Sequence, residues 1–163
     1  MSAVASCLLR LECICSIDVK ESDDLCVCTA LRKASRAITR VYDDALASHG
    51  LTTPQFAILR LIGKAPDMAL TRLATDLVMD RSTLYRSIGP LERQGWIALR
   101  VEGARAKHVD LTDTGRALLA AATADWAAVQ TRVTKSFGRD AWTDLEKRLV
   151  ALTAVAPPPS VGR

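Results

Sequence analysis

The chain has 163 residues, of which 49% are hydrophobic and only 4% aromatic, so we expect one domain with a core of Leu, Ala, Val and Ile. The net charge of +4 does not by itself indicate a polyanion partner, but residues 52–116 hold ten Lys or Arg against seven Asp or Glu. The lack of any run of eighteen apolar residues argues against a membrane span, and no glycine-rich phosphate loop, G-x-S-x-G elbow or paired metal-ligand motif points to an enzyme.

Both ends of the chain are expected to lie outside the folded domain. In the opening MSAVASCLLRLECICS, Arg10 and Glu12 interrupt the apolar run and no basic region precedes it, which argues against a secretory signal. We interpret residues 1–22 as a disordered arm and residues 156–163, APPPSVGR, as a disordered tail. The domain then covers residues 23–155 of a protein expected to be cytoplasmic.

Three helices are predicted in the first half of this domain. ALRKASRAITRVYDDALASHG has apolar residues at helical spacing and stops at its final glycine; they are Leu31, Ala34, Ile38, Val41 and Leu46. TPQFAILRLIG is predicted to have Thr53 as its cap and Pro54 at its first helical position. ALTRLATDLVM is predicted to be capped by Thr71 and to end just before Asp80.

The segment MDRSTLYRSIGPLERQGW predicts a fourth helix over about 81–94, with Asp80 as its N-cap. Leu84, Ile88 and Leu91 recur at i, i+4 and i+7, which makes one buried apolar stripe. A proline inside a helix removes a backbone hydrogen bond, so we expect a kink or a loosened turn at Pro90. The outward face is polar and basic, with Arg81, Ser82, Thr83, Tyr85, Arg86 and Ser87.

A β-hairpin is predicted next, because WIALRVEGARAKHVDLT alternates apolar and polar residues on both sides of a turn at Gly103. Arg105 and Lys107 lie at its tip and Arg100 at its base. A long helix, TDTGRALLAAATADWAAVQTRVTKSF, and a last one capped by Asp140 follow. Two short helices with a tight turn and then a basic hairpin indicate a winged helix-turn-helix.

The segments LTTPQFAILRLI, LTRLATDLVMDRSTLYRSIGPLERQGWIALR and RAKHVDLTDTG together resemble the multiple antibiotic resistance regulator (MarR) family of transcription factors. The resemblance covers about Cys26 to Val155, in the family's order. It implies a mainly α fold with a DNA-binding lobe over about residues 52–116, and a homodimer built from the N- and C-terminal helices. It further implies a regulator, more specifically a repressor, whose two recognition helices read a pseudo-palindromic operator of double-stranded DNA at a spacing of roughly 34–36 Å.

The resemblance also assigns DNA contacts. On the recognition helix these are Ser82, Thr83 and Arg86, with Arg81 and Tyr85 beside them. In the hairpin, Arg105 matches the family's wing arginine, but Gly103 replaces the aspartate that helps to hold it, so Arg105 is expected to be held less firmly. Arg100 and Lys107 either contact phosphates or form a solvated hairpin face.

The pair Cys26 and Cys28 lies where a helix N-terminus would lower the pKa of a thiol. Cys28 and Tyr42 have the fourteen-residue spacing of the reactive cysteine and a tyrosine in the family's organic-hydroperoxide-responsive branch. That branch has tyrosines where this chain has Arg32 and Thr53, so the resemblance is partial. It implies a sensor in which thiol oxidation displaces the helix and separates the reading heads.

Two other interpretations of the cysteines stay open. They are small buried apolar residues, or Cys13, Cys15, Cys26 and Cys28 bind a metal, although zinc-ribbon spacing and supporting histidines are lacking. We expect no metal and no cofactor.

A small aromatic carboxylate or phenol is the commoner signal in the resembled family. Arg36, Arg40 and Tyr42, with Trp126, are the candidate residues of such a cleft, while the alternative for Trp126 and Trp142 is packing in the dimer core. A rival function is a helical protein-interaction module without DNA binding. The Arg, Ser, Thr and Tyr side chains on the outward face of residues 81–87 argue against that rival.

Overall fold

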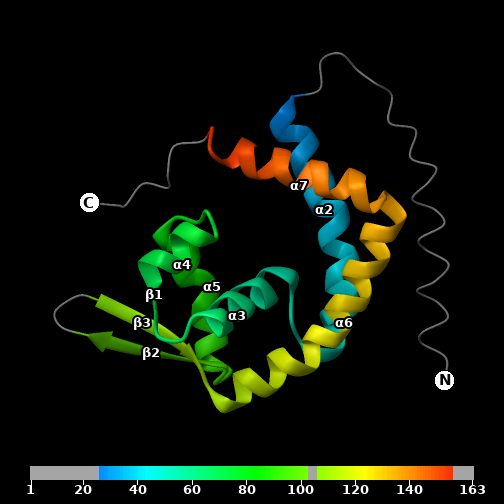
Figure 1. The fold of residues 1–163 in the computed structure, drawn as a ribbon. Coiled ribbons are helices and arrows are strands. Elements are labelled where there is room, and N and C mark those ends of the chain that lie inside the picture. The colour runs from blue at the N-terminus through cyan, green and yellow to red at the C-terminus, as the bar shows by residue number, and fades with distance from the viewer. Residues whose placement is uncertain (1–25, 103–105, 156–163) are drawn as a thin grey trace, which may run out of the picture. The chain divides into compact units, whose positions relative to one another are not determined.

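The computed structural model describes residues 26–102 and 106–155 (Figure 1). The predicted arm and tail, the turn at Gly103 and the wing residue Arg105 therefore lie outside the described residues. The chain divides into two compact units at the boundary between Arg36 and Ala37. The first unit is described only as residues 26–36, and the second holds the rest of the fold.

The second unit is mainly helical and carries a small antiparallel sheet, which confirms the predicted winged helix-turn-helix class. In chain order the elements are α2 (Val27–Leu46), η2 (Ala47–His49), α3 (Thr53–Lys64), β1 (Met68–Ala69), α4 (Leu70–Asp76), α5 (Arg81–Arg93), β2 (Ile97–Glu102), β3 (Ala106–Leu111), α6 (Asp113–Phe137) and α7 (Arg139–Thr153). The sheet has the order β1-β3-β2, and the two-residue strand β1 was not predicted. Its residue Met68 pairs with Val109 of the hairpin.

The start of α3 differs from the prediction by one residue. Thr52, with extended backbone, is the N-cap, and its backbone N–H donates to Gln55 Oε1 at 2.9 Å. Thr53 cannot serve as the cap because its N–H and its hydroxyl both donate to Asp43 Oδ1, at 2.6 and 2.7 Å. This carboxylate ties the end of α2 to the start of α3.

Two other predicted caps were wrong because each helix begins before the predicted cap residue. Thr71 lies inside α4, because pairing of β1 with β3 keeps Ala69 extended and the helix begins directly after it. Asp140 lies in the first turn of α7, and Gly138, with φ 94°, is the N-cap. In addition, α4 ends before Val78, whose left-handed φ of 53° makes the turn into α5.

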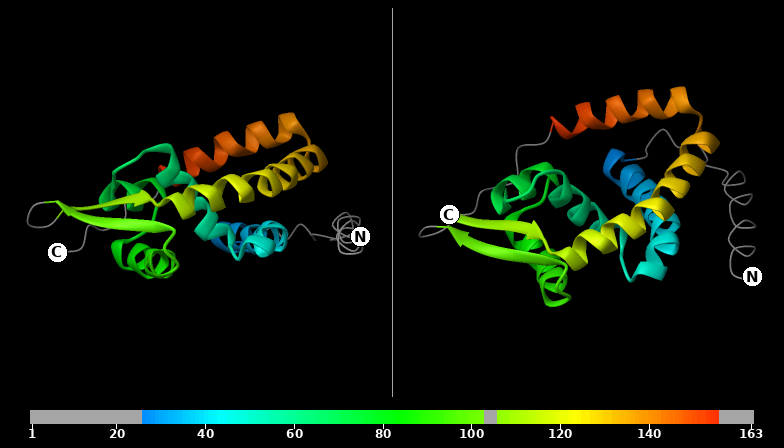
Figure 2. Two further views of the ribbon diagram at one scale, coloured as in Figure 1. Left: turned by 90° about the horizontal axis from the view of Figure 1, so that it is seen from below. Right: turned by 60° about the horizontal axis from the view of Figure 1, so that its bottom comes forward.

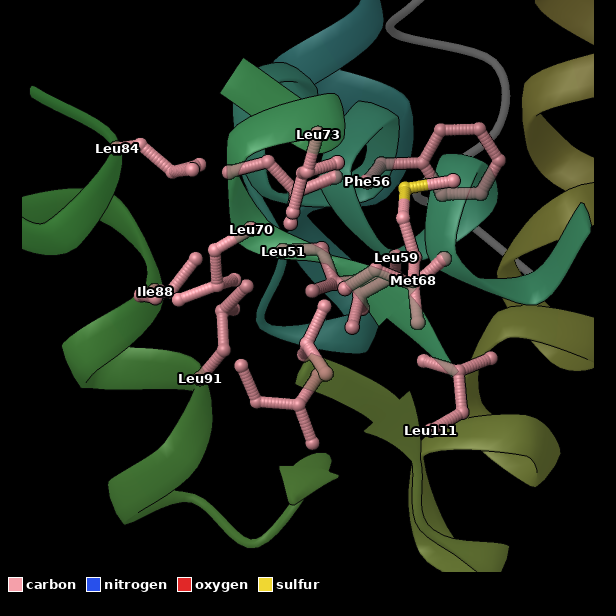
Figure 3. Close-up of a cluster of buried hydrophobic side chains, with 14 of the residues drawn as sticks. Leu51, Phe56, Leu59, Met68, Leu70, Leu73, Leu84, Ile88, Leu91 and Leu111 are labelled. Atoms are coloured by element: carbon pink, nitrogen blue, oxygen red, sulfur yellow. The ribbon is translucent and has the colours of Figure 1, made fainter. Parts of the chain in front are cut away.

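The predicted stripe of α5 is buried, as expected. Leu84 and Ile88 are 1% exposed and Leu91 is fully buried. Figure 3 shows these three side chains pointing from α5 toward Leu70 and other core residues. Complete burial of a leucine or isoleucine contributes about 1.5–3 kcal/mol, so the stripe fixes which face of α5 is turned outward.

The helix α5 continues without interruption through Pro90, although a kink or a loosened turn was expected there. The residue before a proline is normally pushed out of the α region by a clash between its Cβ and the proline ring. Gly89 has no Cβ, which removes part of that clash. The helix ends at Arg93, and Gly95, with φ 71°, reverses the chain toward β2.

Several large apolar side chains on α2, α6 and α7 are exposed. Of the stripe predicted on the first helix, Leu46 is buried, but Leu31 and Ile38 are 39% and 42% exposed. The helix α7, which follows α6 after the turn at Gly138 (Figure 2), has no buried residue, and its Val150 is 65% exposed. No helix among the described residues is both long enough and apolar enough to cross a membrane.

A substitution at Gly115 tests how closely α6 packs against Trp96, the residue directly before β2. A Cβ at this buried position would lie 1.9 Å from the carbonyl oxygen of Trp96, so Gly115→Ala should lower the free energy of unfolding by about 3 kcal/mol or more. The exposed neighbour Thr114→Ala should change it by less than about 0.5 kcal/mol. Urea unfolding measures both variants, and equal stabilities would show that the chain avoids this contact.

Candidate nucleic-acid interface

The first turn of α5 is organised by the carboxylate of Asp80. Its oxygens accept hydrogen bonds from the Thr83 backbone N–H at 2.8 Å, from Ser82 Oγ at 2.6 Å and from Thr83 Oγ1 at 2.9 Å. The Ser82 hydroxyl, followed by the backbone and side chain of Thr83, lowers the pKa of Asp80 from its ordinary value to about 2. The predicted N-cap is therefore confirmed, and it also fixes two of the predicted DNA-contacting side chains.

The cations of α5 lie on its outward face. Arg81 and Arg86 are exposed, and Tyr85 is 42% exposed. Arg86 Nη2 donates to Thr83 Oγ1 at 3.3 Å, so a chain of polar contacts leads from the cap along the helix surface. Of the residues predicted on the outward face, Thr83 and Ser87 are half-buried.

The hairpin contacts this helix through Lys107. Its ammonium group lies 5.2 Å from the centre of the Tyr85 ring, within the range of a cation–π interaction. A cavity of about 260 Å³ opens where β1, α4, α5 and β3 meet, and Arg81 and Lys107 bring positive charge to its lining. Thr71 also lines it, a residue that the sequence did not single out as functional.

Arg100, at the base of the hairpin, forms an ion pair with Asp67. Asp67 has a left-handed φ of 56° and also contacts the ring of His108, whose Nδ1 lies 3.0 Å from the Asp67 backbone oxygen. The Pro66-Asp67 pair is a turn signal in the sequence, but nothing in the sequence indicates that this turn meets the hairpin. The side chain of Asp67 is thus a feature that only the fold reveals.

The comparisons with known proteins agree with this geometry. The crystal structure of the M. tuberculosis transcriptional regulator MosR matches with a TM-score of 0.72 and 32% identity, covering 82% of this chain and 97% of MosR. The MarR family model matches residues 51–100, which hold α3, α4, α5 and the start of the hairpin. This chain belongs to the MarR family. MosR has also been solved in complex with DNA, and that structure matches equally well, with a TM-score of 0.72.

Two curated relatives are transcriptional regulators. TtmR of Methylorubrum extorquens (strain PA1) is 30% identical over 103 residues, which cover 62% of this chain and only 53% of TtmR, so the match spans about half of that protein. The organic hydroperoxide resistance transcriptional regulator of Bacillus subtilis (strain 168) is 28% identical over 116 residues, covering 70% of this chain and 78% of that protein. The predictions of a MarR-family regulator and of a protein that is not an enzyme are confirmed.

The thiol nearest the helix start in this MarR-family chain is Cys26, directly before α2. Both Cys26 and Cys28 are free and exposed, so within one protomer they are not the small buried residues of the packing interpretation. Hydrogen bonds from the backbone N–H groups of Thr29 and Cys28, and then from the Thr29 side chain, lower the pKa of Cys26. Among the described residues, no cluster of three or more potential ligands could hold a metal.

Tyr42, the predicted partner of the sensing cysteine, is buried, and its hydroxyl donates to Gln130 Oε1 of α6. Burial raises the pKa of this phenol, which keeps it a neutral donor. Thr53, at a position where the peroxide-responsive branch has a tyrosine, is bonded to Asp43. Both hydroxyls thus bind side chains of the same protomer.

The candidate residues of the ligand cleft have different surroundings. The ring of Trp126 stacks on that of Phe56, with ring centres 5.7 Å apart. The Arg60 guanidinium lies 4.0 Å from the centre of the Trp126 ring. Trp126 therefore packs inside the protomer rather than standing free, while Arg36 and Arg40 are exposed on α2. Trp142 lies edge-on to Phe137, with ring centres 6.5 Å apart.

Asp80 makes the stability of the protein depend on pH in a predictable direction. Its folded pKa of about 2 lies below its ordinary 3.8, so the ionised carboxylate stabilises the native state above about pH 4, and this contribution is lost as the pH falls toward 2. Asp80→Asn keeps an oxygen for the cap but cannot titrate. Its thermal midpoint, measured at constant ionic strength, should fall less steeply than that of the wild type between pH 4 and 2. Parallel profiles would contradict this role of Asp80.

Proposed function

We propose that the protein is a homodimeric repressor that binds a pseudo-palindromic operator, with α5 of each subunit in the major groove. The observation that carries the proposal is the division of α5 into a buried stripe and an outward face with Arg81, Tyr85 and Arg86, beside a hairpin that brings Lys107 to the same surface. An α-helix fits the major groove of B-DNA, where base edges can be distinguished. The DNA-bound structure of MosR supports this reading.

The side chains divide between reading and positioning. Arg86 has the donors for a bidentate contact to guanine, whereas the hydroxyls of Ser82 and Thr83 donate to Asp80 and offer their remaining lone pairs as acceptors. Arg81 and Lys107 line the cavity beside α5, which suits a backbone phosphate. Arg105 remains a proposed wing contact on the basis of the family resemblance alone.

Dimerisation is proposed for the helices outside the DNA-binding lobe. Large apolar side chains are exposed on all three of them, with Val27, Leu31 and Ile38 on α2, Phe137 on α6, and Val150 and Leu152 on α7. Exposed apolar side chains gathered on a few elements mark interaction sites. A second copy of this chain would cover them and hold two recognition helices at the spacing of successive major grooves.

Arg86→Ala should strongly weaken specific DNA binding and leave the dimer intact. We would measure binding to the intergenic DNA upstream of the protein's own gene by fluorescence anisotropy, and the mass of the free protein by light scattering. Losing a bidentate base contact costs about 1–3 kcal/mol in each half-site, so the affinity should fall at least tenfold. Arg148→Ala on α7 removes an arginine that pairs with Asp144 and serves as the control. Normal operator binding by Arg86→Ala would refute the placement of α5.

The proposed signal is oxidation of the Cys26-Val-Cys28 pair by an organic hydroperoxide. The exposed Cys26, with its lowered pKa, is the better nucleophile, and the name of the Bacillus subtilis relative supports peroxide as the oxidant class. The Cys26 thiolate attacks the peroxide, the O–O bond breaks, an alcohol leaves and a sulfenic acid forms. The Cys28 thiol then attacks that sulfur and releases water, which gives a disulfide.

This disulfide would disturb α2, because side chains two residues apart in a helix point in different directions. The first turn would have to unwind to bring the two sulfurs together. Since α2 belongs to the proposed dimer contact, such a change alters the spacing of the two reading heads. Two linked recognition helices lose most of their combined affinity for DNA when the spacing between them no longer matches the operator.

Cys28→Ser and Cys26→Ser should each bind DNA normally when reduced and should both lose the response to cumene hydroperoxide. The wild type should release DNA on oxidation, lose two hydrogen atoms by mass spectrometry, and bind again after a thiol reductant is added. A response that survives in both variants would move the sensor elsewhere. If the oxidant does not change DNA binding by the wild type, the second candidate signal, a small aromatic ligand, is favoured instead.

A further inference from the structure

The root of the hairpin holds three polar side chains that come from three different strands or turns. Asp67 precedes β1, Arg100 lies on β2 and His108 on β3, and we call these three residues the wing root. Strand pairing sets Arg100 opposite His108 and His108 opposite Ala69. The Asp67 carboxylate pairs with the Arg100 guanidinium and lies 3.2 Å from His108 Nδ1.

The hairpin needs such an anchor because little other secondary structure holds it. An isolated two-stranded hairpin is marginally stable in water, and β1 adds only two residues to its β3 edge. Asp67 gives that short strand a defined beginning. Its φ of 56° belongs to the left-handed region, which aspartate and asparagine tolerate better than most residues, and this backbone directs both its carboxylate and its carbonyl oxygen toward the hairpin.

Arg100 and Lys107, the Arg and Lys residues in the described part of the hairpin, differ in how their charges are matched. The positive charge of Arg100 is matched within the protomer by Asp67. Lys107 has no carboxylate partner among the described residues, and it lies over the Tyr85 ring on the lining of the cavity beside α5. The Asp67 carboxylate offsets the charge of the Arg100 guanidinium, so an approaching phosphate would meet a nearly neutral pair, whereas the ammonium of Lys107 offers an unmatched charge.

We infer that Asp67 is a positioning residue for DNA binding: it holds the wing through Arg100 and His108, and Arg100 is committed to this contact rather than to a DNA phosphate. The inference rests on the proposed DNA-binding function. It separates two residues that the sequence alone treats alike, since Arg100 and Lys107 are both basic residues of one hairpin. Of these two residues, only Lys107 then contributes to the dependence of binding on salt.

The test compares the slopes of log K against log salt concentration for the upstream intergenic duplex. Each neutralised phosphate contributes a slope of about −0.9, so Lys107→Gln should flatten the slope by about 0.9 for each subunit that binds. Arg100→Gln should leave the slope unchanged while it weakens binding two- to fivefold, about the size expected from losing an exposed ion pair. Thermal unfolding checks that each variant is folded.

Asp67→Asn keeps the left-handed backbone and removes the charge. It should weaken binding as much as Arg100→Gln does, and the double variant Asp67→Asn/Arg100→Gln should be no weaker than either single variant, because both break the same contact. Asp144→Asn on α7 also removes one carboxylate from an arginine pair and should bind like the wild type. It controls for the change in net charge.

Hydrogen exchange of the free protein gives a second readout that does not depend on DNA. Amides of residues 97–102 and 106–111 should exchange faster in Asp67→Asn than in Asp144→Asn. A slope that flattens by about 0.9 per subunit in Arg100→Gln would make Arg100 a phosphate contact and overturn the inference. Unchanged exchange in the hairpin of Asp67→Asn would also overturn it. Faster exchange together with a wild type that binds no DNA would refute the proposed function but leave the anchor in place.

Discussion

Burial of one apolar stripe on α5 is the constraint on which the rest of this site depends. Leu84, Ile88 and Leu91 are almost completely inaccessible and leave the helix no freedom to rotate about its axis. Because a helix has a fixed angular relation between its faces, the burial of these three side chains dictates that Arg81 and Arg86 point outward. The surface proposed to face DNA is thus a consequence of the packing of the core.

Carboxylates on this mildly basic lobe act as internal acceptors. Asp80 gathers the hydroxyls of Ser82 and Thr83 at the start of α5, and Asp67 holds Arg100 at the root of the wing. Near a polyanion, negative charges are unfavourable unless they are compensated. In both places the carboxylate accepts hydrogen bonds from neighbouring donors, so it orders the proposed interface and its charge is partly balanced.

The chain joins several of its helices through polar contacts and leaves apolar side chains exposed. The Thr53 hydroxyl donates a hydrogen bond to Asp43, and the Tyr42 hydroxyl donates one to Gln130. His49 Nε2 lies 2.7 Å from Asp125 Oδ2. These contacts connect the second half of α2 and the following η2 with α3 and α6, while α7 buries none of its residues. Such a distribution suits a subunit whose interior is completed by a second copy, and it leaves Cys26 and Cys28 at an exposed end of α2.

Sequence alone determined the class of the fold and the outward face of α5, because helical periodicity and the Asp80 cap are local properties of the chain. The tertiary structure decided the features that join distant segments. Thr53 was predicted as a cap but is bonded to Asp43, β1 forms only because β3 is beside it, and Arg100 is paired with a carboxylate thirty-three residues away. Spacing along the chain shows which side chains share a face, but which partner each one meets depends on how the faces pack.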